Sequence, residues 1–239
     1  MRDFFSLDGA FSKYGGMLAD MVILSLMWIL FCLPFVTAGA STTALYYVST
    51  RRIADREGYI TSDFWLAFKS NIKRATIIWM IIVLIVAVLV FNILALIDGE
   101  TLQGGIFTFM LPAQLVLLFV IALMSVYIYP LIARFDMGLI QVLKSAFYMA
   151  VRHFLTTITC LILLVASLFI LWNFPPMLVV APGLYAWLVS HMIMRIFKKY
   201  RPEMDRDPML EIAEIEARKA EERRRQELGL DSKEEEEEE

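Results

Sequence analysis

The sequence predicts an all-α fold, a polytopic bundle of transmembrane helices followed by a charged helical tail. Hydrophobic residues make up 59% of the 239 residues, and the mean hydropathy is +0.65. Soluble domains are only about 45–50% apolar. Residues 21–50 form a stretch of 30 residues without a charged side chain. Several further runs have the roughly 20 apolar residues that a helix needs to cross a bilayer. We therefore expect residues 1–200 to lie in a lipid bilayer.

The formal net charge of −3 combines two regions of opposite sign. Residues 1–202 carry 15 Lys/Arg and 9 Asp/Glu, which gives +6, whereas residues 203–239 carry 7 and 16, which gives −9. Cys32 and Cys160 lie inside apolar runs without further metal ligands nearby, so we interpret them as small buried hydrophobic residues.

The first crossing is expected over about residues 15–35. Residues 1–16 carry charges and show no cleavage site, so we interpret them as an amphipathic surface segment rather than a signal peptide. Asp20 lies one turn inside the crossing. An ionisable group there is a functional candidate, although headgroups or backbone donors at the helix end could also satisfy it. Pro34 lacks a backbone donor and should end or kink the helix.

A second helix is expected over about residues 38–56, with Thr37 or Ser41 as its N-cap. Its first 13 residues carry no charge, whereas a helix on the membrane surface should show a charged face. Its small residues, which include Gly39 and Ala44, permit close helix approach. We interpret it as a short sixth crossing packed among five long ones. A re-entrant or interfacial segment is the alternative.

The next helix should run from Asp63 to Ile97, which is about 52 Å at 1.5 Å per residue. That exceeds the bilayer thickness. Its first part is amphipathic, with Phe64, Ala67 and Phe68 on one face. We therefore expect the crossing itself over residues 75–97, with Trp79 near the interface.

Residues 106–129 should cross back, with Gln114 in the early turns. Residues 127–136 (YIYPLIARFD) then combine tyrosines, Pro130 and Arg134, which we interpret as an interfacial belt. A second long amphipathic helix should follow from Leu139 and cross over residues 154–173. It aligns with residues 67–74 at a constant offset of 79, which suggests a parallel two-helix repeat.

The last crossing is expected over residues 177–197, interrupted by Pro182 and Gly183. His191 lies in its inner half. It is either a proton-relay or ligand group or an ordinary hydrogen-bonded histidine near the interface.

Basic residues in short loops predict the orientation. Residues 51–74 carry six Lys/Arg and residues 130–153 carry three, whereas residues 98–105 and 173–176 carry none. The basic segments and the C-terminus should therefore be cytoplasmic. Six crossings also place the N-terminus in the cytoplasm, and five would place it outside.

Residues 201–239 are expected to form a charged cytoplasmic tail that is partly helical and then disordered. Asp207 can cap a charge-paired helix whose apolar positions hold no heptad. The run 223–225 of three arginines could touch anionic lipid, and residues 234–239 are disordered by composition.

Three motifs resemble the YesL family of bacterial membrane proteins. They are residues 33–40 (LPFVTAGA) with 44–47 (ALYY), residues 64–73, and residues 129–135 (YPLIARF). The resemblance extends over about residues 4–200 and excludes the tail. It implies a multi-pass plasma-membrane protein without an established activity, often found beside carbohydrate uptake systems of the ATP-binding-cassette type. The motif positions are Pro34, Thr37, Gly39, Ala44, Tyr46, Phe64, Phe68, Tyr129, Pro130, Arg134 and Phe135.

The residues show no nucleophile–base pair, HExxH-like spacing or nucleotide-binding loop. We expect no enzyme, no cofactor or metal, and no nucleic-acid partner. Two function classes stay open. One is an accessory component associated with a carbohydrate uptake system. The other is a small-solute binder or transporter that acts on its own, with polar groups along a path: Asp20, Asn92, Gln114 and His191.

Overall fold

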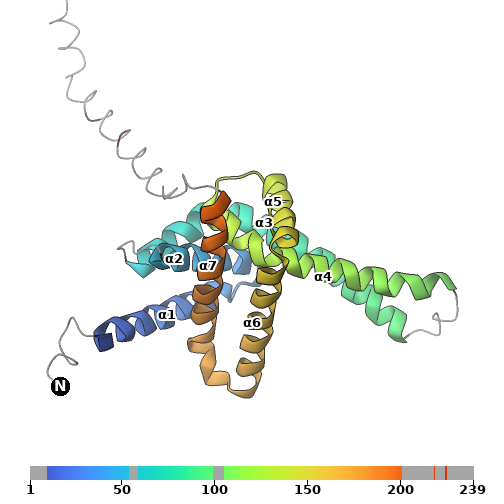
Figure 1. Ribbon diagram of the computed structural model, residues 1–239, viewed down its shortest axis with the longest axis horizontal. Helices are drawn as coiled ribbons and strands as arrows, with labels where there is room; N and C mark the ends of the chain where they lie inside the picture. The colour runs from blue at the N-terminus through green and yellow to red at the C-terminus, as the bar shows by residue number, and fades with distance from the viewer. Residues whose placement is uncertain (1–9, 54–58, 99–104, 201–217, 219–223, 225–239) are drawn as a thin grey trace, which may run out of the picture. The chain divides into compact units, whose positions relative to one another are not determined.

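The computed structural model describes residues 10–53, 59–98 and 105–200, together with residues 218 and 224. The chain divides into two compact units, Met1–Ile196 and Phe197–Glu239. Within the described residues all regular structure is helical (Figure 1). The elements in order are α1 (Ala10–Cys32), η1 (Phe35–Thr37), α2 (Ala38–Ile53), α3 (Ile60–Asp98), α4 (Gly105–Arg134), α5 (Leu139–Arg152), α6 (Phe154–Asn173), η3 (Pro175–Val179) and α7 (Ala181–Tyr200).

Four of the described helices are long and apolar enough to cross a membrane: α1 over Gly15–Cys32, α3 over Ile60–Ala95, α4 over Met110–Arg134 and α6 over Phe154–Asn173. Only a small share of the side chains on α1, α3 and α6 in these spans is buried in the isolated chain. Such apolar surfaces are stable against lipid rather than water. The all-helical prediction is therefore confirmed for the described residues, and these four helices are candidate membrane spans by length and composition.

The predicted count of five long crossings plus a sixth is not confirmed, because four of the described helices qualify as candidate spans. The described part of α2 has 16 residues, which is about 24 Å of helix. The helix α7 ends in Lys198 and Lys199, which lower its apolar character. Neither helix belongs to the four spans.

The centre of the first unit is α2. All its residues from Gly39 to Thr50 except Thr42 are buried, and it packs against α1, α3 and α4. The prediction of a buried helix without a charged face is confirmed. Its small residues allow the close approach: a Cβ added at Gly39 would lie 2.5 Å from Trp79 Cβ and 2.7 Å from the Ala75 carbonyl oxygen of α3.

The turn between α1 and α2 differs from the expected N-cap. The Thr37 hydroxyl lies 2.7 Å from the Phe31 carbonyl and 2.8 Å from the Pro34 carbonyl, and Ser41 donates to the Trp28 carbonyl at 3.0 Å. The capping prediction was therefore wrong. The Phe31 carbonyl is one of the last four of α1, which have no partner within the helix, and the Thr37 hydroxyl satisfies it.

The long helix after Ser62 is confirmed as one element, since α3 has 39 residues. Phe64, Ala67 and Phe68 are buried on one face as predicted. Phe31 of α1 contacts this face, with ring centroids 5.6 Å from Phe64 and 4.8 Å from Phe68. Trp79, expected near the interface, donates its Nε1–H to the Phe35 carbonyl at 2.9 Å.

The second long helix was predicted as continuous, and this was wrong. The helix breaks at His153, whose φ of −111° and ψ of 43° are not helical, and so α5 and α6 are separate. The Thr157 hydroxyl donates to the His153 carbonyl at 2.9 Å and lies 3.1 Å from Tyr127 Oη, which ties the break to α4. Because α3 has no such break, the proposed repeat of two long helices is not matched in secondary structure.

The interfacial belt in residues 127–136 was also misplaced. Tyr127 is fully buried, Tyr129 is 8% exposed and Arg134 is 4% exposed. Pro130 lies inside α4, which continues to Arg134. These residues pack within the protein because α4 contacts α2, α3, α5 and α6.

Pro182 and Gly183 begin a helix rather than interrupt one, since α7 starts at Ala181 after η3. Proline tolerates the first helical turn because its missing N–H has no helical partner there. Residues 1–9 of the N-terminal amphipathic segment, Arg56, the loop at residues 99–104 and the tail predictions lie outside the described residues. Residues 10–16 of that segment belong to α1.

A pocket between α1, α2 and α7

One pocket of the first unit lies where α1, α2 and α7 meet the start of α3. Its cavity volume is about 490 Å³. It is lined by Gly16, Met17, Asp20, Met21, Leu24, Val48, Ser49, Arg52, Ile53, Ile60, Gly183, Trp187 and His191. This volume lies within the roughly 300–1,000 Å³ typical of small-molecule sites.

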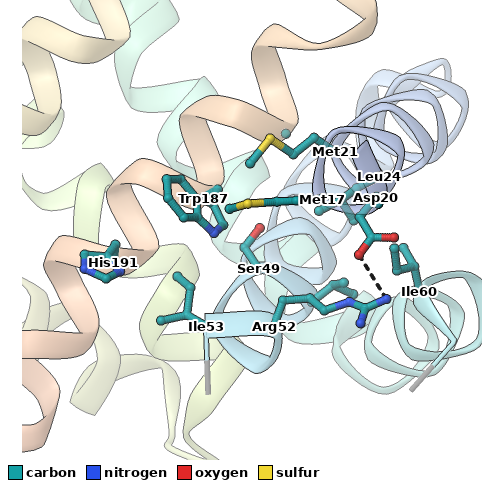
Figure 2. A pocket seen from close by; sticks show the side chains of 13 residues that line it. Met17, Asp20, Met21, Leu24, Ser49, Arg52, Ile53, Ile60, Trp187 and His191 are labelled. Atoms are coloured by element: carbon teal, nitrogen blue, oxygen red, sulfur yellow. Dashed lines mark ion pairs between the residues drawn. The ribbon is translucent and has the colours of Figure 1, made fainter. Parts of the chain in front are cut away.

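The charged part of the pocket is an ion pair. Arg52 Nη2 lies 3.1 Å from Asp20 Oδ2, and the two side chains are 39% and 35% exposed (Figure 2). The contact joins the first half of α1 to the end of α2. Since both partners are more than a third exposed, the pair contributes little to stability, and its groups stay accessible.

The neighbouring arginine is engaged elsewhere. Arg51 Nη1 lies 2.8 Å from Asp63 Oδ1, and both side chains are only about 15% exposed, at 14% and 15%. This pair joins the end of α2 to the first turn of α3. Consecutive arginines therefore connect α2 to two different helices, and only Arg52 faces the pocket.

The opposite side of the pocket is built by α7. Figure 2 shows Trp187 beside Met17 and Met21, with His191 farther along the same helix. His191 Nε2 lies 3.1 Å from Arg195 Nη2. An arginine can only donate, so His191 Nε2 is the acceptor in this contact.

A close helix contact positions α7 against α1. A Cβ added at Gly183 would lie 2.5 Å from the Met21 carbonyl oxygen. The Gly183 N–H donates to Ser25 Oγ at 2.8 Å, and the Ser25 hydroxyl donates to the Met21 carbonyl at 2.8 Å. Glycine is needed here because any side chain would meet the α1 backbone.

Two of the three predicted intramembrane polar candidates meet at this pocket, namely Asp20 and His191. Gln114 does not line it. Its Oε1 is buried and has no hydrogen-bond partner in the described part of the chain. Asn92, the fourth group of the hypothetical path, is exposed on α3. A polar path through all four residues is therefore not formed within this unit.

The motif positions of the first two motifs serve helix packing. Gly39 and Ala44 form the α2 contact surface, and Phe64 and Phe68 pack on α1. Tyr46 is 4% exposed and lies beside Tyr185 of α7. Pro34 and Thr37 shape the turn described above. None of these residues lines the pocket.

The third motif is also structural. Tyr129 and Arg134 are buried on α4, and the Phe135 N–H continues the helix by donating to the Leu131 carbonyl at 2.9 Å. The described residues contain no group of three or more His, Cys, Asp or Glu side chains arranged to hold a metal ion. Cys160 is buried and Cys32 half-buried, both as free thiols.

Sequence reasoning missed Arg52 as a site residue, because it treated the arginine only as a headgroup anchor. It also missed Met17, Ser49 and Trp187. One signal was available: Val36 stands midway between Asp20 and Arg52. In an antiparallel hairpin that turns near Val36, residues equally far from the turn lie at the same level. Trp187 had no comparable signal, because its position depends on the Gly183 contact.

Comparison with known proteins gives one match. The family model described as "Protein of unknown function, DUF624" matches residues 21–93. This is the family of the YesL-like proteins, and the match includes the first two of the three motifs that carry the resemblance. No curated protein and no solved structure matches the chain. From Met21 in α1 to Ile93 in α3, the chain is therefore similar to this family.

Proposed function

We propose that this protein is a non-enzymatic, multi-pass plasma-membrane protein that serves as an accessory component of a carbohydrate uptake system of the ATP-binding-cassette type. The observation that carries the accessory role is where the motif residues lie. They form helix contacts between α1, α2, α3 and α4, and none lines the pocket. Motif residues that serve helix packing suit a protein that presents a surface rather than a reaction site.

The proposal includes six crossings with both termini in the cytoplasm. The Arg52–Asp20 contact supports this topology. It brings the start of α1 to the level of the end of α2, so both lie on one side of the membrane. The positive-inside rule puts the arginines at the end of α2 in the cytoplasm. A re-entrant α2 would instead return its end to the level where α1 stops.

Affinity purification of the tagged full chain in mild detergent tests the accessory role. We expect permease and ATPase subunits of a carbohydrate transporter to co-purify, and an unrelated tagged membrane protein of similar size serves as the control. Recovery of the chain without any transporter subunit, from cells that express the transporter, would contradict the proposal.

The second candidate function is binding of a small solute, and the pocket between α1, α2 and α7 is the observation that favours it. It combines Asp20, Arg52 and His191 with apolar walls in one cavity. A Met17→Trp substitution should fill the cavity and abolish solute binding by the purified protein in liposomes. Leu18→Trp is the matched control, because Leu18 is 57% exposed and does not line the pocket. Equal binding by both variants would refute this function.

A further inference from the structure

We propose that the pocket between α1, α2 and α7 binds an amphiphilic anion, with its phosphate or carboxylate on Arg52 and its apolar part against Met17 and Trp187. The inference rests on the second candidate function and names the ligand class of that site. The same chemistry could come from an acidic lipid of the bilayer or from a free amphiphilic metabolite.

The walls of the pocket select an apolar body. Seven of its 13 lining residues are large and apolar: Met17, Met21, Leu24, Val48, Ile53, Ile60 and Trp187. Methionine side chains adapt to irregular ligands because they are unbranched and polarizable. A fully hydroxylated solute would need many polar partners around it, whereas the polar lining residues are few, and the Ser49 hydroxyl already donates to the Leu45 carbonyl at 2.8 Å.

Arg52 has donors to spare. One of its terminal nitrogens, Nη2, lies 3.1 Å from Asp20 Oδ2. A guanidinium group carries five N–H donors in a planar fork. A phosphate or carboxylate can therefore bind the fork in a bidentate manner, while the exposed pair with Asp20 loosens at little cost.

Arg52 is the cationic donor of the pocket wall. Its charge and that of Asp20 sum to zero, and Arg195 contacts His191 without lining the pocket. An acidic headgroup would therefore be bound by the guanidinium group of Arg52 itself rather than by a net positive charge of the pocket.

Quenching of Trp187 fluorescence tests the inference. The full chain is reconstituted in vesicles of phosphatidylcholine that contain either brominated phosphatidylglycerol or brominated phosphatidylcholine. The Trp187 signal is the difference between the protein and its Trp187→Phe variant. We expect Trp187 quenching to require about tenfold less of the anionic brominated lipid than of the zwitterionic one.

The variants isolate the role of the guanidinium group. Arg52→Gln should reduce the preference to about parity, and Arg52→Lys should retain part of it, because a lysine keeps the charge without the fork. Lys73→Gln is the control that loses the same charge at an exposed position on α3. A preference that persists in Arg52→Gln would overturn the inference, as would a loss of equal size in Lys73→Gln.

A second arm separates the sources of the ligand. Octyl phosphate that relieves the quenching by brominated phosphatidylglycerol, where octyl glucoside does not, supports a free amphiphilic anion. Quenching that octyl phosphate leaves unchanged supports a bilayer lipid. Equal quenching by both lipids would refute the preference for an anion, and the pocket would then be a lipid-binding site without charge selectivity. Absence of any Trp187 quenching would refute the inference, whereas the second candidate function is decided separately by solute binding in the Met17→Trp and Leu18→Trp variants.

Discussion

Replacing Gly39 with alanine should destabilise the fold, because the contact between α2 and α3 leaves no room for a methyl group. The added Cβ would lie 2.5 Å from Trp79 Cβ and 2.7 Å from the Ala75 carbonyl oxygen. An ordinary van der Waals contact begins at 3.4 Å. The helices must therefore separate by about 0.9 Å (3.4 − 2.5) or bend locally. Neither blocking atom is the end of a flexible side chain that could turn away.

The size of the effect follows from this separation. A radial gap of about 0.5–1 Å forfeits a quarter to a half of each dispersion contact, and packing is a main force between helices in a bilayer. Overpacking of a tight core costs typically about 1–3 kcal/mol. We expect Gly39→Ala to lower the free energy of unfolding by about 2 kcal/mol, in spite of the better helix propensity of alanine.

The assay is unfolding in mixed micelles with increasing sodium dodecyl sulfate, followed by circular dichroism. Gly15→Ala is the matched control. Gly15 also lies in a helix, but an added Cβ meets nothing within 4 Å, so this change should be neutral or stabilising by about 0.5–1 kcal/mol. If Gly39→Ala proves as stable as Gly15→Ala, the close approach of α2 and α3 is refuted.

Three other predictions concern an ion pair, a hydrogen bond and the orientation of the chain in the membrane. Arg51→Ala and Asp63→Ala should each lower the free energy of unfolding by about 2 kcal/mol, since each removes one member of the Arg51–Asp63 ion pair and leaves the other charge part-buried. A double variant that costs the full sum would show no coupling between them. Thr37→Val should lower the free energy of unfolding by about 1 kcal/mol, because the Phe31 carbonyl at the end of α1 loses its hydroxyl donor. An unchanged unfolding midpoint would disprove that role. Single cysteines should react with impermeant reagents from the cytoplasmic or the outer side according to the proposed orientation, and reversed labelling would contradict it. The cytoplasmic positions are Ser70 and Lys144, and the outer position is Asn173.

Local sequence was informative wherever one helix decides the outcome by itself. The absence of charge from residues 38–50 and the small side chains of Gly39 and Ala44 predicted a buried, closely packed α2. The apolar face of Phe64 and Phe68 predicted the buried side of α3. These predictions succeeded because periodicity and side-chain size act within one helix.

Prediction failed where the environment of a residue comes from a distant helix. Tyrosines before Pro130 are as suitable for a lipid interface as for a packed core. Tyr127 lies in the core, where its Oη is 3.1 Å from the hydroxyl oxygen of Thr157 of α6. The break at His153 had no local cause such as a proline, and so the sequence suggested a continuous helix.

The sequence by itself determined that this chain is a helical membrane protein, because apolar runs of sufficient length have no other stable solvent than lipid. It also determined which side chains are small enough for helices to meet. Only the tertiary structure decided that Asp20, Arg52 and His191 surround one pocket. That outcome depends on which helices become neighbours, and in lipid this is set by shape and close contact, as at Gly183, rather than by hydrophobic pattern.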